Sequence, residues 1–191
     1  MTVYDWLILA FWLMFIAYWA ISAPGAKRTV GRRGWGWEGG LRLSILVLVL
    51  LAFHVPAVHR ALRNARLSAA SFRLVAGPVG IALCALGIGL AIWARAHLGR
   101  NWGMPMSRKE NPELVTTGPY RFVRHPIYGG ILLAMLGSTI GASIVWLLPL
   151  VVSCAYFVFS ARAEEKLMLE QFPAQYSAYR QRTKMMLPFM L

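Results

Sequence analysis

Two segments of this chain carry residue types that could do chemistry, and a long apolar stretch separates them. The first segment contains RHPIY at 124–128, and the second contains RAEE at 162–165. Carboxylates and tyrosine rings attract cations, and an arginine can hold a carboxylate through two parallel hydrogen bonds. These residues suit the binding of a charged ligand, provided that the fold brings both segments to one place.

Proline and glycine define the backbone around the first segment. Gly118-Pro119 predicts a turn, because proline fixes φ and glycine tolerates unusual backbone angles. Pro126 keeps His125 out of the helical region and suits the first position of a helix, where a missing N–H costs nothing. His125 and Tyr128 should therefore lie within one turn of a helix N-terminus, where free backbone N–H groups can hold an anion.

Each of these residues also has a purely structural interpretation. Arg121 and Arg124 are typical interfacial anchors, and a lone histidine such as His125 at a membrane boundary is more often a satisfied polar residue than a catalyst. The glutamate pair could form a solvated helix face, and Tyr176 and Tyr179 an interfacial aromatic ridge. The sequence contains no HExxH, CxxC, Walker or GxSxG motif, and we expect no metal site.

The composition of the chain is that of a membrane protein. Of the 191 residues, 58% are hydrophobic and only 14% are charged, whereas about a quarter of the residues in a soluble domain are charged. This composition excludes an ordinary soluble globule and a disordered chain. Cys84 and Cys154 both lie in apolar runs, so they predict neither a disulfide framework nor a zinc site.

The apolar runs predict an all-α membrane bundle of about five transmembrane helices. A span needs roughly 20 apolar residues, and Tyr4–Ala23, Leu43–Val58 and Val75–Trp93 are candidates. The fourth run, Ile127–Ser160, is uncharged, and as one helix it would measure about 51 Å. We therefore expect a break near residues 137–143 and a helical hairpin that returns both polar segments to one membrane face.

The net charge of +13 is explained mainly by membrane topology. With five spans, 16 basic residues fall on one side of the membrane and 4 on the other, whereas four spans give 11 and 9. The positive-inside rule therefore favours five spans, with the N-terminus outside and both polar segments in the cytoplasm. Nucleic-acid binding is not expected. We predict an N-terminal region of three spans, 1–92, followed by a catalytic region, 93–191.

Several motifs, in this order and spacing, resemble the isoprenylcysteine carboxyl methyltransferase family. They are LVTTGPYRFVRHPIYGG at 114–130, RAEE at 162–165, QFPAQYSAY at 171–179 and LPF at 187–189. The resemblance covers about half the chain. It implies an integral-membrane enzyme that uses S-adenosylmethionine (SAM) at its cytoplasmic face, in a family related to the membrane phospholipid N-methyltransferases.

The resemblance also implies roles for individual residues. The arginine that meets the substrate corresponds to Arg162, which would clamp a carboxylate of the acceptor. The tail glutamate that contacts the cofactor corresponds to Glu165, and its neighbour Glu164 could take that part. The implied cofactor-binding residues are Leu114, Val115, Tyr120, His125, Pro126, Ile127, Tyr128, Glu164 and Glu165.

These observations predict methyl transfer from SAM to a lipophilic acceptor that enters from the bilayer. The expected acceptor is the carboxylate of an isoprenylcysteine-like or prenylated substrate. A carboxylate is already ionised at neutral pH and needs no general base, whereas an amine must first lose a proton. The alternatives are methylation of a phospholipid or other small amphiphile, an NADPH-dependent membrane reductase, and a non-enzymatic polytopic protein. No oligomeric state is predicted.

Overall fold

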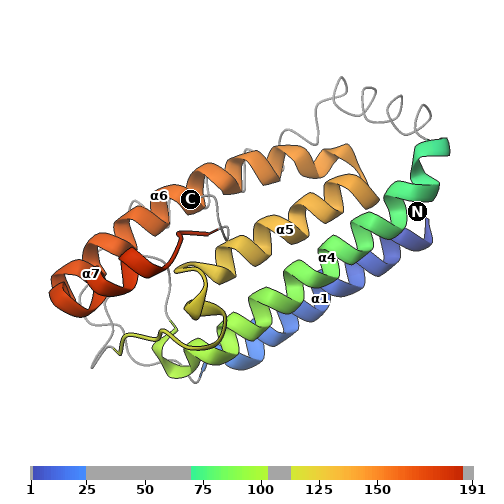
Figure 1. The fold of residues 1–191 in the computed structure, drawn as a ribbon. Coiled ribbons are helices and arrows are strands. Elements are labelled where there is room, and N and C mark those ends of the chain that lie inside the picture. Colours follow the sequence, from blue (N-terminus) through green and yellow to red (C-terminus); the bar gives the residue numbers. More distant parts are fainter. Residues whose placement is uncertain (1, 25–69, 103–112, 187–191) are drawn as a thin grey trace, which may run out of the picture.

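The computed structural model describes residues 2–24, 70–102 and 113–186, and these residues form an α-helical bundle (Figure 1). Within them, three short 3-10 turns and an isolated β-bridge accompany the α-helices. The α-helices are α1 (Val3–Ser22), α4 (Ala70–Leu98), α5 (Pro126–Gly141), α6 (Leu147–Gln171) and α7 (Pro173–Arg182), and the 3-10 turns are η1 (Gly99–Asn101), η2 (Gly118–Arg121) and η3 (Ile144–Trp146). The predicted all-α membrane bundle is confirmed.

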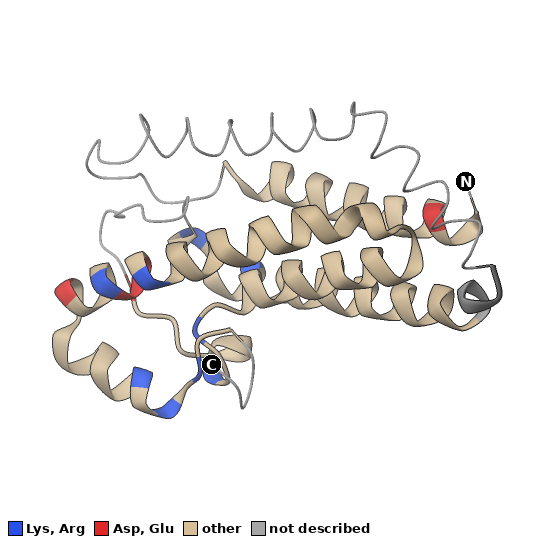
Figure 2. Ribbon diagram, turned by 90° about the horizontal axis from the view of Figure 1, so that it is seen from above, with Lys and Arg blue, Asp and Glu red and all other residues tan. Residues whose placement is uncertain are grey.

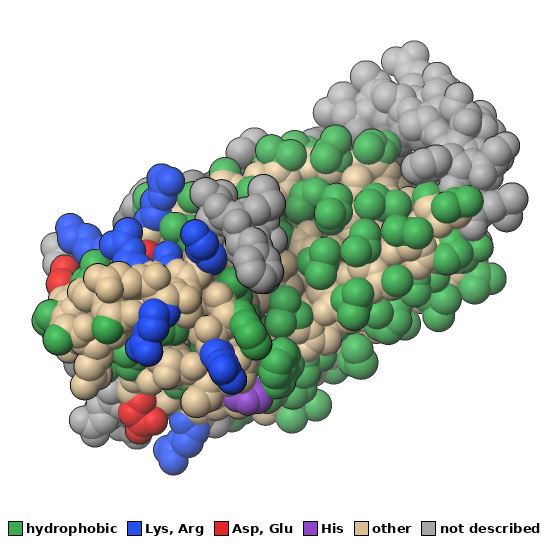
Figure 3. All heavy atoms as spheres, in the orientation of Figure 1, with side chains coloured by type: hydrophobic (Ala, Val, Ile, Leu, Met, Phe, Trp, Pro, Cys, Tyr) green, Lys and Arg blue, Asp and Glu red, His purple; other side chains and the backbone are tan. Residues whose placement is uncertain are grey.

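Three segments of the described chain are long and apolar enough to cross a membrane. They are Val3–Ser22, Val75–Asn101 and Ile144–Gln171, and α5 is a shorter apolar helix beside them. Hydrophobic side chains cover the visible face of the helical bundle, while charged side chains gather at the end where α7 lies (Figure 3). The predicted span Leu43–Val58 lies outside the described residues.

The predicted break in the long apolar run is confirmed. α5 ends at Gly141, and the Ser143 side chain accepts a hydrogen bond from the N–H of Val145 at the start of η3. α6 begins at Leu147 and runs back alongside α5 in the opposite direction (Figure 1). As a result, the polar C-terminal part of α6 returns to the end of the bundle where α5 begins.

α4 and α5 pack with their backbones in direct contact. A Cβ added at Gly80 would lie 2.3 Å from the Cα of Gly141, and one added at Gly87 would lie 2.4 Å from the backbone nitrogen of Ala134. Such close approach is possible only between small residues, as is common in membrane helices. This contact fixes the position of α5, and therefore of the polar residues at its N-terminus, relative to α4.

α1 is attached to the same pair of helices through Trp12. The Trp12 indole donates a 3.0 Å hydrogen bond to the Ser138 hydroxyl on α5, and its ring stacks on Trp146 with centroids 5.3 Å apart. The division between residues 92 and 93 falls inside α4, a continuous helix, and remains a prediction.

Candidate functional site

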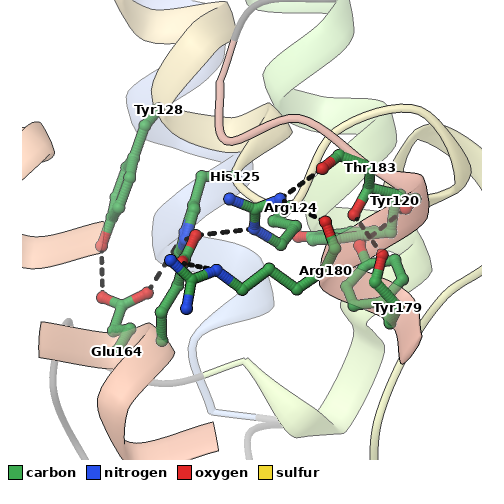
Figure 4. A network of polar contacts seen from close by, with 9 residues as sticks. Tyr120, Arg124, His125, Tyr128, Glu164, Tyr179, Arg180 and Thr183 are labelled. Carbon is green, nitrogen blue, oxygen red and sulfur yellow. Dashed lines mark hydrogen bonds and ion pairs between the residues drawn. The ribbon is translucent and has the colours of Figure 1, made fainter. Parts of the chain in front are cut away.

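The two polar segments meet at the end of the bundle where α5 begins (Figure 4). The Tyr128 phenol donates a 2.5 Å hydrogen bond to Oε1 of Glu164, and Nε of Arg124 lies 2.6 Å from Oε1 of Glu165. His125 lies between these two contacts (Figure 4). The hairpin therefore brings RHPIY and the glutamate pair together, as expected from the sequence.

The backbone before α5 has the predicted turn and helix start. Gly118 adopts φ = 58°, a conformation that favours glycine, and a Cβ there would lie 2.3 Å from the ring of His97. His125 is the N-cap of α5 with φ = −125° and ψ = 59°, and Pro126 is the first helical residue. Together with η2, these residues hold His125 and Tyr128 at the N-terminus of α5.

The chain after α7 runs beside this turn and is hydrogen-bonded to it. The backbone N–H groups of Arg124 and His125 donate 2.8 Å hydrogen bonds to the carbonyls of Lys184 and Met185. Val123 and Lys184 form the parallel bridge between the two segments. The position of residues 122–125 is thus set by the chain that follows α7, about 60 residues later.

Tyr120 and two α7 tyrosines are buried behind the turn. The Tyr179 hydroxyl donates a 2.7 Å hydrogen bond to the carbonyl of Tyr120, and Tyr176 is 3% exposed. Burial raises the pKa of Tyr179 to about 12 and also raises the pKa values of Tyr120 and Tyr176, so all three phenols stay protonated at neutral pH. The two α7 tyrosines are therefore buried packing residues and do not form an exposed interfacial ridge.

Arg124 connects three parts of the molecule. Its Nε pairs with Glu165 on α6, and its Nη1 donates to the carbonyl of Thr183 and, at 3.3 Å, to that of Arg180. Nε of Arg180 also lies 3.6 Å from Oε2 of Glu165. We call Arg124, Glu165, Arg180 and Thr183 the Arg124 cluster. The Arg124 side chain is 8% exposed, so it is buried in an ion pair and is not an interfacial anchor.

Three rings form an aromatic stack beside this cluster. His125 stacks on Tyr128 with centroids 5.5 Å apart, and Tyr128 stacks on Phe157 of α6 at 4.5 Å. Nδ1 of His125 lies 3.5 Å from Oε2 of Glu164. Nε2 of His125 lies 3.5 Å from Oε1 of Glu165, yet it is buried and forms no hydrogen bond within the described chain. The contact of Nε2 with Glu165 thus has ion-pair distance without hydrogen-bond geometry.

Most of the predicted site residues lie at this end of the bundle. Tyr120, His125, Pro126, Ile127, Tyr128, Glu164 and Glu165 belong to the turn, the start of α5 or the facing part of α6. Leu114 and Val115 are half-buried in the irregular chain that leads into η2. Their main chain has no hydrogen bond to the stack or to the Arg124 cluster among the described contacts.

Arg162 does not join the cluster. It is exposed, and it makes no ion pair or hydrogen bond with any residue in the described ranges. In a helix with 3.6 residues per turn, Arg162 and Glu164 point about 160° apart, so Arg162 lies on the far side of α6 from the aromatic stack. Its predicted clamp would have to act on an acceptor at the outer face of α6.

The interpretation of the sequence missed Arg124, Arg180 and Thr183 as members of the site. A signal was present for Arg124, since it directly precedes His125 and a buried carboxylate needs a cationic partner. Nothing in the sequence pairs Arg180 or Thr183 with that arginine. Within 2–24, 70–102 and 113–186, no group of three or more His, Cys, Asp or Glu side chains could hold a metal ion.

Comparison with known proteins identifies relatives of this chain. The chain is 32% identical over 115 residues to cobalt-zinc-cadmium resistance protein CzcN of Cupriavidus metallidurans, covering 58% of this chain and 50% of that protein. It is 29% identical over 111 residues to nickel-cobalt-cadmium resistance protein NccN of Alcaligenes xylosoxydans xylosoxydans, covering 56% and 52%. The chain thus spans about half the length of these curated relatives.

The family model for phospholipid methyltransferases matches residues 75–175, more than half of the chain. This range includes α4 from residue 75 onward, the turn before α5, α5 and all of α6 with its two glutamates. It confirms the resemblance to membrane methyltransferases drawn from the motifs. The chain therefore belongs to the phospholipid methyltransferase family, whose members are integral-membrane methyltransferases related to the isoprenylcysteine carboxyl methyltransferases.

Proposed function

We propose that this protein transfers a methyl group from SAM to a lipophilic carboxylate, such as an isoprenylcysteine-like substrate, at the cytoplasmic face of the membrane. The observation that carries the proposal is the meeting of RHPIY at 124–128 with Glu164 and Glu165 around a stack of aromatic rings. Family membership supports methyl transfer in a membrane. The motif resemblance supports SAM as the donor and a carboxylate as the acceptor.

The residues present fit SAM. SAM combines a sulfonium cation, an amino-acid group and an adenosine, and when bound it supplies a methyl group activated by the positive sulfur. His125 and Phe157 cover the two faces of the Tyr128 ring, so the group that suits a cation is the Glu164 carboxylate beside the stack, which also suits ribose hydroxyls. The buried Nε2 of His125, which forms no hydrogen bond in the described chain, offers one further polar contact.

The remaining proposed contacts come from the main chain and from Tyr120. Leu114 and Val115 precede the turn in an irregular segment whose main chain would line the adenine end. Pro126 and Ile127 begin α5; Pro126 has no backbone N–H, and the N–H of Ile127, which has no acceptor within the helix, would face an anion such as the carboxylate of SAM. Tyr120 is buried under this turn and supports it from behind.

The acceptor would approach from the bilayer along α6. Leu148, Val151 and Phe159 are exposed on this helix, and exposed Arg162 continues the same stripe at helical spacing. An amphiphile lying on this face would place its chain on the apolar residues and its headgroup near Arg162. Methyl transfer requires the acceptor oxygen next to the sulfonium, so the carboxylate would have to turn from Arg162 toward the aromatic stack. Because a carboxylate is already ionised, the enzyme's main tasks are orientation and removal of water from the acceptor.

The charge distribution supports a membrane orientation for this site. The five-span arrangement that obeys the positive-inside rule places the turn before α5 and the chain after Ser160 in the cytoplasm. We propose that orientation, with the N-terminus on the opposite side. SAM, a water-soluble cofactor, would then reach the site from the cytoplasm while the acceptor arrives through the bilayer.

A phospholipid headgroup amine is the second candidate acceptor, because the matching family is described as phospholipid methyltransferases. An amine must lose a proton before or during methyl transfer. His125, in the aromatic stack, and Glu164 beside it are the groups that would accept this proton. An amine acceptor therefore needs Glu164 or His125 as a proton acceptor, whereas a carboxylate acceptor does not.

Binding and product chemistry test the proposal. Isothermal titration of the detergent-solubilised protein should show binding of SAM and of its demethylated product, and no binding of NADPH. Labelled SAM should then transfer its methyl group to a farnesylcysteine derivative, giving a product that releases methanol in base. A base-stable product from phosphatidylethanolamine would favour the amine instead, and binding of NADPH without SAM would overturn methyl transfer.

A further inference from the structure

We infer that Glu165 and Arg124 position the site without touching the cofactor, and that the contact with the cofactor belongs to the adjacent glutamate, Glu164. The identity of that cofactor rests on the proposed function, whereas the division of roles rests on the geometry of the two carboxylates. Adjacent acidic residues thus serve different purposes, although the family motif does not distinguish them.

Both oxygens of the Glu165 carboxylate already contact cationic groups of the protein. Its Oε1 accepts a 2.6 Å hydrogen bond from Nε of Arg124, and its Oε2 lies 3.6 Å from Nε of Arg180. The residue is 4% exposed. Nε2 of His125 also lies 3.5 Å from Oε1. A buried carboxylate needs its compensating partners, and a ligand cation would have to displace Arg124 to reach Oε1.

Arg124 uses the same guanidinium to hold the chain after α7. Besides Glu165, it donates to the carbonyls of Arg180 and Thr183. The backbone N–H groups of Arg124 and His125 donate to the carbonyls of Lys184 and Met185 directly alongside. Loss of the guanidinium would therefore release α7 and residues 183–185 from the turn that carries His125.

Arginine is required for this geometry. Its Nε and Nη1 donate in different directions, to a side chain on α6 and to backbone carbonyls after α7. A lysine at the same position would keep the charge facing Glu165 but would present one ammonium group in place of the planar fork. The conservative change Arg124→Lys therefore separates the charge from the geometry.

Glu164 faces the other side of the site. It bonds the Tyr128 phenol and lies 3.5 Å from Nδ1 of His125, next to the aromatic stack (Figure 4). Its side chain is 25% exposed, compared with 6% for Glu165. Of the two carboxylates, Glu164 is therefore the one that a cationic ligand beside the aromatic stack can reach.

Two matched pairs of variants in the full-length, detergent-solubilised protein test this division. Glu164→Gln and Glu165→Gln make the same chemical change at adjacent positions. Arg124→Gln is compared with Arg121→Gln, because Arg121 is exposed one turn earlier and has no hydrogen bond or ion pair with the described residues. Hydrogen exchange of residues 120–128 and 179–186 reports the contact between the turn and the tail, and titration with SAM reports the ligand.

We expect E165Q and R124Q to speed exchange in both peptides and to lower kcat by about 100-fold, the size expected for misplacement by about 1 Å. R124K should recover part of the exchange protection. E164Q should leave exchange as in the wild type and weaken SAM binding by about 10-fold or more. R121Q should change neither measurement.

The division of roles is overturned if E165Q and R124Q exchange like the wild type, or if E165Q weakens SAM binding as much as E164Q without faster exchange. R124K is the control for loss of folding, since this variant retains the positive charge at residue 124. A wild-type protein that binds no SAM would instead refute the proposed cofactor, while the exchange data would still decide whether Arg124 and Glu165 hold the turn and tail together.

Discussion

The Tyr128 phenol donates a 2.5 Å hydrogen bond to Glu164, although 36 residues separate the two in the sequence. Nearly the whole of that separation is the α5–α6 hairpin, which leaves the bundle end and returns to it. The bond shows that the hairpin has the right length and rotation to assemble a site from its two ends. It also links the aromatic stack to the acidic residues of α6.

Removal of this hydroxyl should weaken cofactor binding while leaving the stack intact. Tyr128→Phe keeps the ring between His125 and Phe157 but leaves Glu164 without its 2.5 Å donor. A hydrogen bond to a charged group contributes about 1.5–3 kcal/mol, so we expect SAM affinity to fall about 10-fold or more in a calorimetric titration. Unchanged affinity would mean that this bond does not orient the ligand-binding carboxylate.

Close packing of α4 on α5 should make Gly87 intolerant of any side chain. A Cβ at Gly87 would lie 2.4 Å from the backbone nitrogen of Ala134, whereas one at Gly89 would meet no atom within 4 Å. We expect Gly87→Ala to lower the unfolding temperature clearly, because the two helix backbones must separate. Gly89→Ala, two residues along the same helix, should be neutral or slightly stabilising, since alanine favours helix by about 1 kcal/mol. Equal unfolding temperatures for the two variants would contradict the backbone contact.

Loss of the Tyr179 hydroxyl should destabilise the turn before α5. Tyr179→Phe leaves the buried carbonyl of Tyr120 without its 2.7 Å donor, and an unsatisfied buried acceptor costs about 1–3 kcal/mol. We expect a lower thermal unfolding temperature and faster hydrogen exchange around residue 120. Tyr176→Phe is the matched control, because that hydroxyl has no hydrogen bond within the described chain. A larger effect from the control would refute the assigned contact.

Substitution of Arg162 should affect the acceptor and not the cofactor. The side chain lies on the far side of α6 from Glu164, so Arg162→Gln should raise the KM for a farnesylcysteine acceptor while SAM affinity stays as in the wild type. Lys166→Gln, one turn further along the same exposed face, is the control for a general loss of positive charge. An equal effect of both variants would indicate lipid contact in place of acceptor recognition.

The proposed orientation can be measured directly. A reporter that is active only in the cytoplasm should be active when it is fused after residue 191. The same reporter should be inactive when it is fused before residue 1. This pattern follows from an odd number of spans with the basic loops inside. If both reporters lie on the same side, the number of spans is even. That result would contradict the five-span orientation that gives SAM access to the site from the cytoplasm.

Much of the architecture was predictable because it depends on local composition. An uncharged run too long for one span requires a break, and glycine with serine near residues 137–143 supplies it. Pro126 starts α5 because proline suits the first helical position, and Gly118 makes the turn because its positive φ favours glycine. These features depend on a few neighbouring residues, and so the sequence reveals them.

The partner of each charged residue could not be predicted in the same way. Successive residues in a helix point about 100° apart, so Glu164 and Glu165 necessarily face different neighbours, but the sequence does not say which. The choice depends on the rotation of α6 about its own axis, which is decided by its packing against α5 and by the tail that follows α7. That rotation turns Glu165 toward Arg124 and Arg180, Glu164 toward Tyr128, and Arg162 away from all of them.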